Sequence, residues 1–168
     1  MQIRTETPGD YPAIADILLQ AFGQDAEALL VERIRRSNCY IPELALVAEK
    51  EGLIVGHILF SYIDLVGKET LPVLGLAPLA VHPQYQRQGI GSALVQAGLA
   101  KAEARGEAIA IVLGHPPFYS RFGFEPSVNY GIESPFPVPP EFFMVKFLQL
   151  ERKGYLGRVS YPSAFADL

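Results

Sequence analysis

The residues of this sequence that are best arranged for chemistry lie in one short polar segment, Gln86-Arg87-Gln88-Gly89-Ile90-Gly91. The segment follows an apolar run and precedes residues with helical spacing, so we expect it to join a strand to a helix. Glycines let a backbone approach a ligand closely, and a helix N-terminus offers free N–H groups and a positive dipole end. The arrangement predicts a cradle for a pyrophosphate.

Two common phosphate-binding loops do not fit this segment. Position 94 is Leu, so the dinucleotide-binding pattern G-x-G-x-x-G fails. No Gly-Lys-Ser or Gly-Lys-Thr follows, which excludes the loop of nucleoside-triphosphate-binding proteins. The alternative interpretation of the glycines is a strand-to-helix turn that needs flexible residues for its own conformation.

The neighbouring chain predicts the elements that would hold this loop. Leu71 to Val81 is typical of a buried strand, a helix is expected over 92–105, and Ala108 to Leu113 predicts another strand. Such a unit is most naturally parallel, with a right-handed crossover. Pro78 has no N–H to donate, so it predicts a bulge or a splayed edge within the first strand.

Further elements are expected on both sides of this unit. Apolar residues recur at helical spacing over 8–22 and again after Asp25, which predicts two helices. The runs 45–49 and 53–65 flank a short turn, as in an antiparallel hairpin. A late strand is expected within 142–150, and its exposed edge could pair in a dimer.

Length and composition predict a single domain, residues 1–168, of mixed α/β class. The chain has 168 residues, of which 49% are hydrophobic, and this is enough for one core. We expect a twisted mixed sheet of six to seven strands, parallel at its centre and flanked by helices. The formal net charge is −4 and no block of Lys and Arg occurs, which argues against binding to nucleic acid.

The single cysteine, Cys39, excludes an internal disulfide framework and a thiolate-rich zinc site. No cluster of His, Asp or Glu has ligand spacing, so no metal is expected. The N-terminus lacks the apolar core of a signal peptide, and no run approaches the length that spans a bilayer. We therefore expect a reduced, cytoplasmic protein without a membrane partner, in which Cys39 is a small buried or bystander residue.

Longer patterns around the loop resemble a known family. Leu79-Ala80-Val81-His82-Pro83, then Gln86-x-x-Gly89-x-Gly91 and a helix, resembles motif A of the GNAT superfamily of acyl-CoA-dependent N-acyltransferases. Ala108 to Leu113 followed by Pro117 to Phe124 resembles its motif B. Segments similar to the YhbS-like branch are 54–60, 78–81, 119–126, 143–145 and 161–165. The resemblance thus spans nearly the whole chain and implies a GNAT-like fold.

The resemblance implies that acetyl-CoA is the acyl donor. Backbone N–H groups of the loop would hold the CoA pyrophosphate, and the preceding strand would follow the pantetheine arm. The residues implied are Leu79, Ala80, Val81, Gln86, Arg87, Gln88, Gly89, Ile90, Gly91 and Ser92. Arg87 is the best local cation for a CoA phosphate, or a solvated loop charge. A backbone N–H near Ala80 or Val81 could polarise the thioester carbonyl.

The resemblance also implies a catalytic acid, Tyr119, whose phenol is protonated at neutral pH and could give a proton to the departing thiolate. Its alternative role is packing. Many relatives carry a Glu on the central strand, but residues 74–78 contain none. His115 follows the second parallel strand and is the candidate base, acting through water. Weaker candidates are Glu125, His82 and His57.

These observations predict an N-acetyltransferase that moves the acetyl group of acetyl-CoA to a primary amine by direct attack. Two alternatives are a CoA-binding or regulatory module without turnover, because the strand Glu is missing, and an anion-binding domain unrelated to CoA. Glu27, Glu32 and Glu43 could line the acceptor site and attract a cationic amine, or be solvated. The sequence leaves three properties open: whether the acceptor is a small-molecule or a protein amine, the length of the acyl chain, and whether the protein is a monomer or a homodimer.

Overall fold

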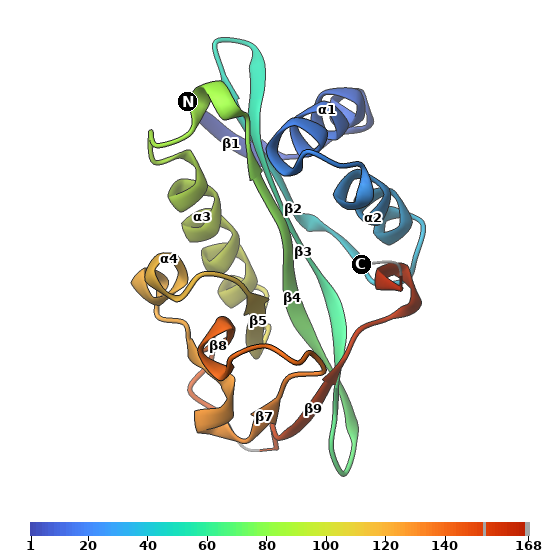
Figure 1. The fold of residues 1–168 in the computed structure, drawn as a ribbon, viewed down its shortest axis with the longest axis vertical. Coiled ribbons are helices and arrows are strands. Elements are labelled where there is room, and N and C mark those ends of the chain that lie inside the picture. The colour runs from blue at the N-terminus through green and yellow to red at the C-terminus, as the bar shows by residue number, and fades with distance from the viewer. Residues whose placement is uncertain (153, 167–168) are drawn as a thin grey trace.

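The computed structural model describes residues 1–152 and 154–166, which form one twisted sheet with helices on both faces (Figure 1). The strands are β1 (Gln2–Thr5), β2 (Tyr40–Lys50), β3 (Leu53–Val66), β4 (Thr70–Val81), β5 (Ile109–Leu113), β6 (Glu125–Pro126), β7 (Ile132–Glu133), β8 (Phe143–Phe147) and β9 (Gly157–Ser160). Seven of them follow the order β1-β2-β3-β4-β5-β8-β6, while β9 pairs with both β3 and β7.

The pairing confirms the predicted mixed α/β class with a parallel centre. β4 and β5 run parallel, and so do the short strands β7 and β9. The described residues form nine strands, whereas six to seven were expected. The excess comes from β6 and β7, which have two residues each, and from β9, which has four. Such strands are too short to show an alternating pattern of apolar residues.

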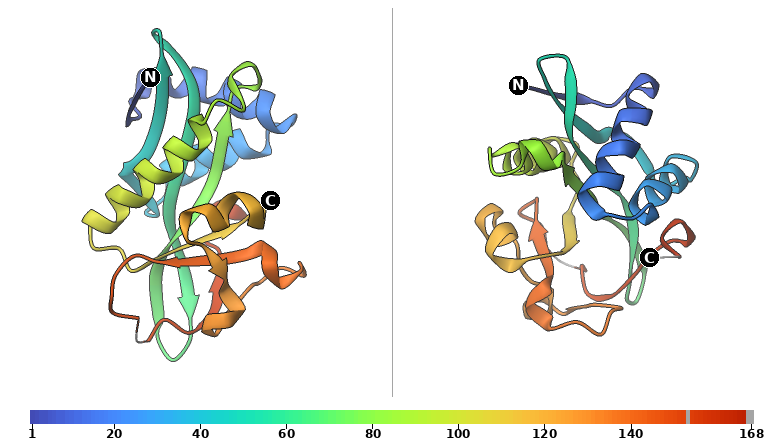
Figure 2. Two further views of the ribbon diagram at one scale, coloured as in Figure 1. Left: turned by 90° about the vertical axis from the view of Figure 1, so that its left-hand side faces the viewer. Right: turned by 45° about the horizontal axis from the view of Figure 1, so that its top comes forward.

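In the described residues, four α-helices cover the sheet: α1 (Tyr11–Phe22), α2 (Ala26–Arg35), α3 (Ile90–Ala104) and α4 (Pro116–Tyr119). α1 and α2 lie on one face, and α3 and α4 lie on the other (Figure 2). Phe22 and Leu29 are apolar residues of these helices, yet each is 41% exposed, because Ile17, Leu18 and Leu30 fill the buried faces. No helix in the described part of the chain is long and apolar enough to cross a membrane.

Helix α3 lies unusually close to the sheet. A Cβ at Gly98 would stand 2.2 Å from Cε1 of Phe60 on β3, and a Cβ at Gly56 would stand 2.9 Å from Cδ1 of Leu94. The two glycines therefore allow the helix and β3 to touch. The helix begins at Ile90, two residues earlier than predicted, and its first turn lies near the end of β4 (Figure 1).

Strand β4 carries the irregularity that Pro78 predicted. Ile58 of β3 stands opposite Leu79, but Phe60 stands opposite Leu76, so Ala77 and Pro78 share one partner position. β4 and β5 pair only at two positions, Leu74 with Ala110 and Gly75 with Ile111. Beyond these pairs the two strands part, so the C-terminal half of β4 has a free edge.

The late strand, β8, lies within the predicted range 142–150 and ends at Phe147. It lies between β5 and β6, and Met144 and Val145 pair with β6 on its outer side. The exposed late edge that was expected to pair in a dimer is therefore covered over these two residues.

A buried polar network holds the N-terminal segment and α2 on the sheet. The carboxylate of Glu6 accepts hydrogen bonds from Arg35 at 2.9 Å and Tyr40 at 2.6 Å, and Nε2 of His57 lies 2.9 Å from it. The side chain of Arg35 is only 13% exposed because it lies in this network. Burial works to raise the pKa of Glu6, but hydrogen bonds from His57, Arg35 and Tyr40 lower it to about 2. Burial also lowers the pKa of His57, so its imidazole is neutral.

Candidate active site

A cavity of about 690 Å³ opens at the N-terminus of α3, and we call it the loop cavity. The residues that line it are Leu79, Val81, Tyr85, Gln86, Arg87, Gly89, Ile90, Gly91, Ser92, His115, Phe118 and Arg121. The cavity thus contains most of the residues that the sequence indicated for a cofactor. Two of those residues are not in its lining: the side chain of Ala80 is buried in the core on the α1 and α2 face, and Gln88 accepts a hydrogen bond from Lys50.

The loop supplies free backbone donors to this cavity. Gly89 stands directly before α3 with φ 83°, a left-handed conformation that favours glycine. The N–H of Ala93 donates to the carbonyl of Gly89, so the N–H groups of Ile90, Gly91 and Ser92 lie ahead of the first closed turn. Together with the helix dipole, they form an anion-binding end.

The free edge of β4 adds further donors. The N–H of His82 donates to a carbonyl of β3, and backbone direction alternates along a strand, so Ala80 also points its N–H to β3. Leu79 and Val81 must point theirs away from β3, toward the gap between β4 and β5. The carbonyl of Val81, which accepts from the side chain of Gln86, points the same way. Of the two predicted donors, Val81 therefore fits and Ala80 does not.

Two arginines border the loop cavity, although the sequence analysis named only Arg87. Nη2 of Arg121 donates to Oγ of Ser92 at 3.3 Å, and its guanidinium lies 5.7 Å from the ring centroid of Phe118. A signal was present in the sequence, because Arg121 is the only Lys or Arg between Arg105 and Lys146. It was missed because it is far from the loop in sequence.

Tyr119 ends α4 and is buried in the core; its neighbour Phe118 lines the loop cavity, but Tyr119 does not. Its ring packs directly on the backbone at the end of β5, since a Cβ at Gly114 would stand 2.3 Å from its Cε2. Edge contacts with Phe118 and Phe124 hold the ring further. Burial raises the pKa of Tyr119 to about 12, so the phenol keeps its proton at neutral pH.

Of the four groups considered as bases, only His115 borders a cavity. It stands before α4, is exposed, and lines the loop cavity. Nδ1 of His82 accepts a backbone hydrogen bond at 3.1 Å within its own turn. His57 is buried against Glu6, and Glu125 accepts a hydrogen bond from a nearby tyrosine.

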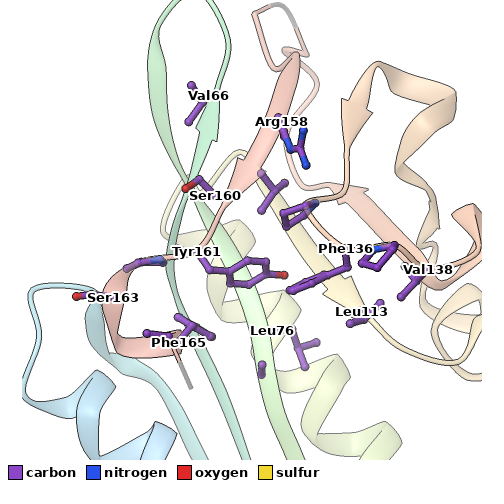
Figure 3. Close-up of a pocket in the computed structure, with 16 residues that line it drawn as sticks. Val66, Leu76, Leu113, Phe136, Val138, Arg158, Ser160, Tyr161, Ser163 and Phe165 are labelled. Carbon is purple, nitrogen blue, oxygen red and sulfur yellow. The ribbon is translucent and has the colours of Figure 1, made fainter. Parts of the chain in front are cut away.

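A second cavity, of about 980 Å³, lies on the α1 and α2 face of the sheet, and we call it the tail cavity (Figure 3). Its lining consists of Val66, Leu76, Ala77, Leu113, Pro135, Phe136, Pro137, Val138, Arg158, Val159, Ser160, Tyr161, Pro162, Ser163, Phe165 and Ala166. Leu76 and Ala77 belong to the free half of β4, and Leu113 ends β5. Both cavities therefore border the place where β4 and β5 part.

Comparison with known proteins identifies the family. The model of the acetyltransferase (GNAT) domain matches residues 2–127. The chain belongs to the GNAT acetyltransferase family. It is 38% identical over 167 residues to the uncharacterized N-acetyltransferase YhbS of Escherichia coli K12, covering 98% of each chain. The predicted family, YhbS-like branch, fold and class of enzyme, an acyltransferase, are thereby confirmed.

Two solved GNAT structures share the architecture of this domain. The crystal structure of Escherichia coli YhbS in complex with CoA is 36% identical, with a TM-score of 0.89, and the match covers 98% of this chain and 91% of that one. A GNAT acetyltransferase from Brucella melitensis in complex with acetyl-CoA is 30% identical, with a TM-score of 0.80 and coverage of 98% and 97%.

The tail cavity of this GNAT acetyltransferase does not contain the three glutamates that the sequence offered either as an acceptor site or as solvated residues. Glu27, Glu32 and Glu43 do not line it; they interact instead with Gln24, Arg36 and Arg105. Among the described residues, the one charged side chain of its lining is Arg158. The lining of this cavity therefore gives no support to an acidic acceptor site at these three residues.

The aromatic residues of the tail cavity had no role in the sequence-based predictions. The segment from Tyr161 to Phe165 is similar to the family branch, and its rings meet Phe136 only in the fold. Cys39 is half-buried and lines neither cavity. Across residues 1–152 and 154–166, His, Cys, Asp and Glu form no group of three that could hold a metal ion.

Proposed function

We propose that this GNAT acetyltransferase transfers the acetyl group of acetyl-CoA to a primary amine by direct attack. The observation that supports this best is the loop cavity, in which the free N–H groups of α3 continue into the free edge of β4. The free N–H groups of α3 suit a pyrophosphate, and the free edge of β4 suits a chain that contains amides. The relatives solved with CoA and with acetyl-CoA support the same assignment.

The residues present fit this donor substrate. Ile90, Gly91 and Ser92 would hold the pyrophosphate through their N–H groups, with Arg87 and Arg121 as cationic partners. Of the remaining predicted residues, Gln86 and Gly89 line the same cavity, while Gln88 and Ala80 would act only by shaping the loop and the strand.

The free edge of β4 would bind the pantetheine arm as a neighbouring strand would, through Leu79 and Val81. One of these N–H groups would also polarise the thioester carbonyl. The amine would enter from the tail cavity, because that cavity borders the same edge at Leu76 and Ala77.

In the proposed step, the amine nitrogen forms a bond to the carbonyl carbon and the bond from that carbon to sulfur breaks. The departing thiolate takes a proton from the phenol of Tyr119, the acetylated nitrogen gives its surplus proton to water, and water returns a proton to the phenolate. The pKa of Tyr119, about 12, keeps the proton available. The same apolar burial would raise the pKa of the thiol and so make the thiolate a stronger proton acceptor.

The proposal does not require a side-chain base in the tail cavity. Among the described residues of its lining there is no Asp, Glu or His, so the amine would arrive neutral or lose its proton to water. His115 could relay that proton through water, but from the loop cavity, on the donor side. A cytoplasmic location, expected from the single Cys39, belongs to this proposal as well.

Isothermal titration with CoA and acetyl-CoA, followed by thiol release with a panel of primary amines, tests the proposal. We expect the Tyr119→Phe variant to lose about 100-fold or more in kcat while its Kd for CoA stays the same. The proposal fails if the variant keeps the wild-type rate and pH profile.

One observation favours a second candidate, a CoA-binding module without turnover. Neither residues 74–78 nor the described lining of the tail cavity offers a carboxylate or an imidazole. This candidate predicts tight CoA binding, no acetylation of any amine in the panel and no effect of Tyr119→Phe on either measurement. Competition by simple diphosphates as strong as that by CoA would instead indicate an anion-binding domain unrelated to CoA.

A further inference from the structure

The lining of the tail cavity limits the amines that it can hold. Most of it is apolar, and three aromatic rings form a continuous wall: the centroid of Tyr161 lies 5.3 Å from that of Phe136 and 5.0 Å from that of Phe165. Such a wall binds an apolar ring or chain. The volume, about 980 Å³, is at the upper end of the range for sites that bind small molecules.

The charge of the lining disfavours polycationic acceptors, which an acidic site would favour. Arg158 on β9 is exposed and borders the cavity. No carboxylate of the described residues forms an ion pair with it, not even Glu133, its neighbour in the β7 and β9 ladder. An unpaired guanidinium repels ammonium groups and presents a planar fork of donors to a carboxylate.

A carboxylate of the acceptor that pairs with Arg158 must lie at the Arg158 end of the tail cavity. Figure 3 shows Arg158 at one end of the cavity and Leu76 toward the other, with the rings of Phe136 and Tyr161 between them. The reacting amine must approach the free edge of β4, at the Leu76 end. An acceptor that uses both ends therefore carries its amine and its anion at opposite ends of an apolar body.

We propose that the acceptor is a small primary amine whose carboxylate is separated from the amine by an aromatic ring or several methylene groups, and that Arg158 binds this carboxylate. The inference rests on the proposed function, since it takes the free edge of β4 as the place of acetyl transfer. The rings of Phe136 and Tyr161 would contact the spacer. An α-amino acid, whose two groups are on one carbon, would not reach both ends.

Matched pairs of amines test the inference. 4-(Aminomethyl)benzoate is compared with 4-methylbenzylamine, and 6-aminohexanoate with hexylamine; phenylalanine and spermidine complete the panel. We expect kcat/KM to favour each acid over its neutral partner by about tenfold or more, the effect of one charge-assisted hydrogen bond. In Arg158→Gln this preference should disappear, whereas in Arg36→Gln, which changes an exposed arginine just after the end of α2, it should persist.

Binding of the N-acetylated products, titrated in the presence of CoA, gives a readout that needs no turnover. Wild-type protein should bind N-acetyl-4-(aminomethyl)benzoate more tightly than N-acetyl-4-methylbenzylamine, and Arg158→Gln should not. A preference for spermidine or for the neutral amines, or an acid preference that survives in Arg158→Gln, would overturn the inference while leaving acetyl transfer intact. Loss of CoA binding, or CoA binding without acetylation of any amine, would instead contradict the proposed function.

Discussion

The loop cavity and the tail cavity border the same edge of β4, but the chain builds them differently. The loop cavity comes mainly from one run, residues 79–92, and many of its donors are backbone N–H groups. The tail cavity combines side chains from five separate parts of the chain, mostly beyond residue 127, where the match to the family model ends. A backbone site can be identified from glycines in one segment, whereas a side-chain site exists only after distant segments have packed.

The largest expected effect concerns the α2 side of the molecule, where α2 packs near residues 163–165 of the tail cavity wall. In Glu6→Gln, Arg35 keeps its buried charge without a carboxylate partner, and we expect the free energy of unfolding to fall by about 3–5 kcal/mol. Denaturant titration measures this. Glu32→Gln, which removes an exposed ion pair with Arg36, is the control and should cost at most about 1 kcal/mol.

The same network should make the protein less stable in acid. The pKa of Glu6 is about 2 in the fold against an ordinary 4.5, so its contribution is complete above pH 4.5 and is lost as the pH falls toward 2. The pKa of His57 in the folded protein is lowered from 6.5. As the pH falls below 6.5, the imidazole therefore takes up a proton in the unfolded chain before it does so in the folded protein, and this destabilises the folded protein. Denaturant titrations of wild type and His57→Gln between pH 7 and 5 should show the smaller decline in the variant; equal declines would contradict this.

On the side of the loop cavity, Gly114→Ala should lower kcat without weakening the binding of CoA. The new Cβ would collide with the ring of Tyr119, whose phenol we propose as the acid, so we expect kcat to fall by about 100-fold. Titration with CoA should give a Kd near that of wild type. Gly9→Ala is the matched control because a Cβ there meets nothing within 4 Å. If both variants kept the wild-type kcat, Tyr119 would have no role that depends on its position.

A smaller effect should show whether the two cavities act independently in the binding of CoA. Arg121→Gln removes a cation from the loop cavity, and we expect its Kd for CoA to rise about tenfold, with a weaker dependence on salt. Arg158→Gln should leave the Kd for CoA unchanged. Titrations of both variants with CoA at two salt concentrations measure this. Equal losses of CoA affinity in the two variants would show that the cavities do not act separately.

The smallest effect is expected from His115, which lies on the donor side. If the amine gives its proton to water, His115→Ala should change kcat/KM by less than about threefold at any pH, below the usual contribution of a general base. In both proteins kcat/KM should rise with pH without a decline up to pH 10, since the pKa of Tyr119 is about 12. If the rise of kcat/KM at low pH were present in wild type and absent in His115→Ala, His115 would be the base.

The sequence predicted what depends on local pattern. It located the parallel unit, the bulge at Pro78 and most of the loop cavity, because glycines, proline and apolar spacing act over a few residues. It failed where a contact joins distant residues. Arg121 reaches Ser92 across 29 positions, and Arg35 is buried only because Glu6 and His57 meet it in the fold. The strands β7 and β9 were missed because their pairing depends on the other strands.

The way β9 is attached to the sheet bears on which segments of such enzymes can vary between relatives. Only three residue pairs join β9 to β3, at Asp64, Leu65 and Val66, while the loop cavity lies entirely before residue 122. Residues 135–138 and 158–166, which line the tail cavity and lie outside β8, could therefore vary without altering the five residue pairs that join β8 to β5. On the proposed function, grafting these two segments from a relative would change which amine is acetylated.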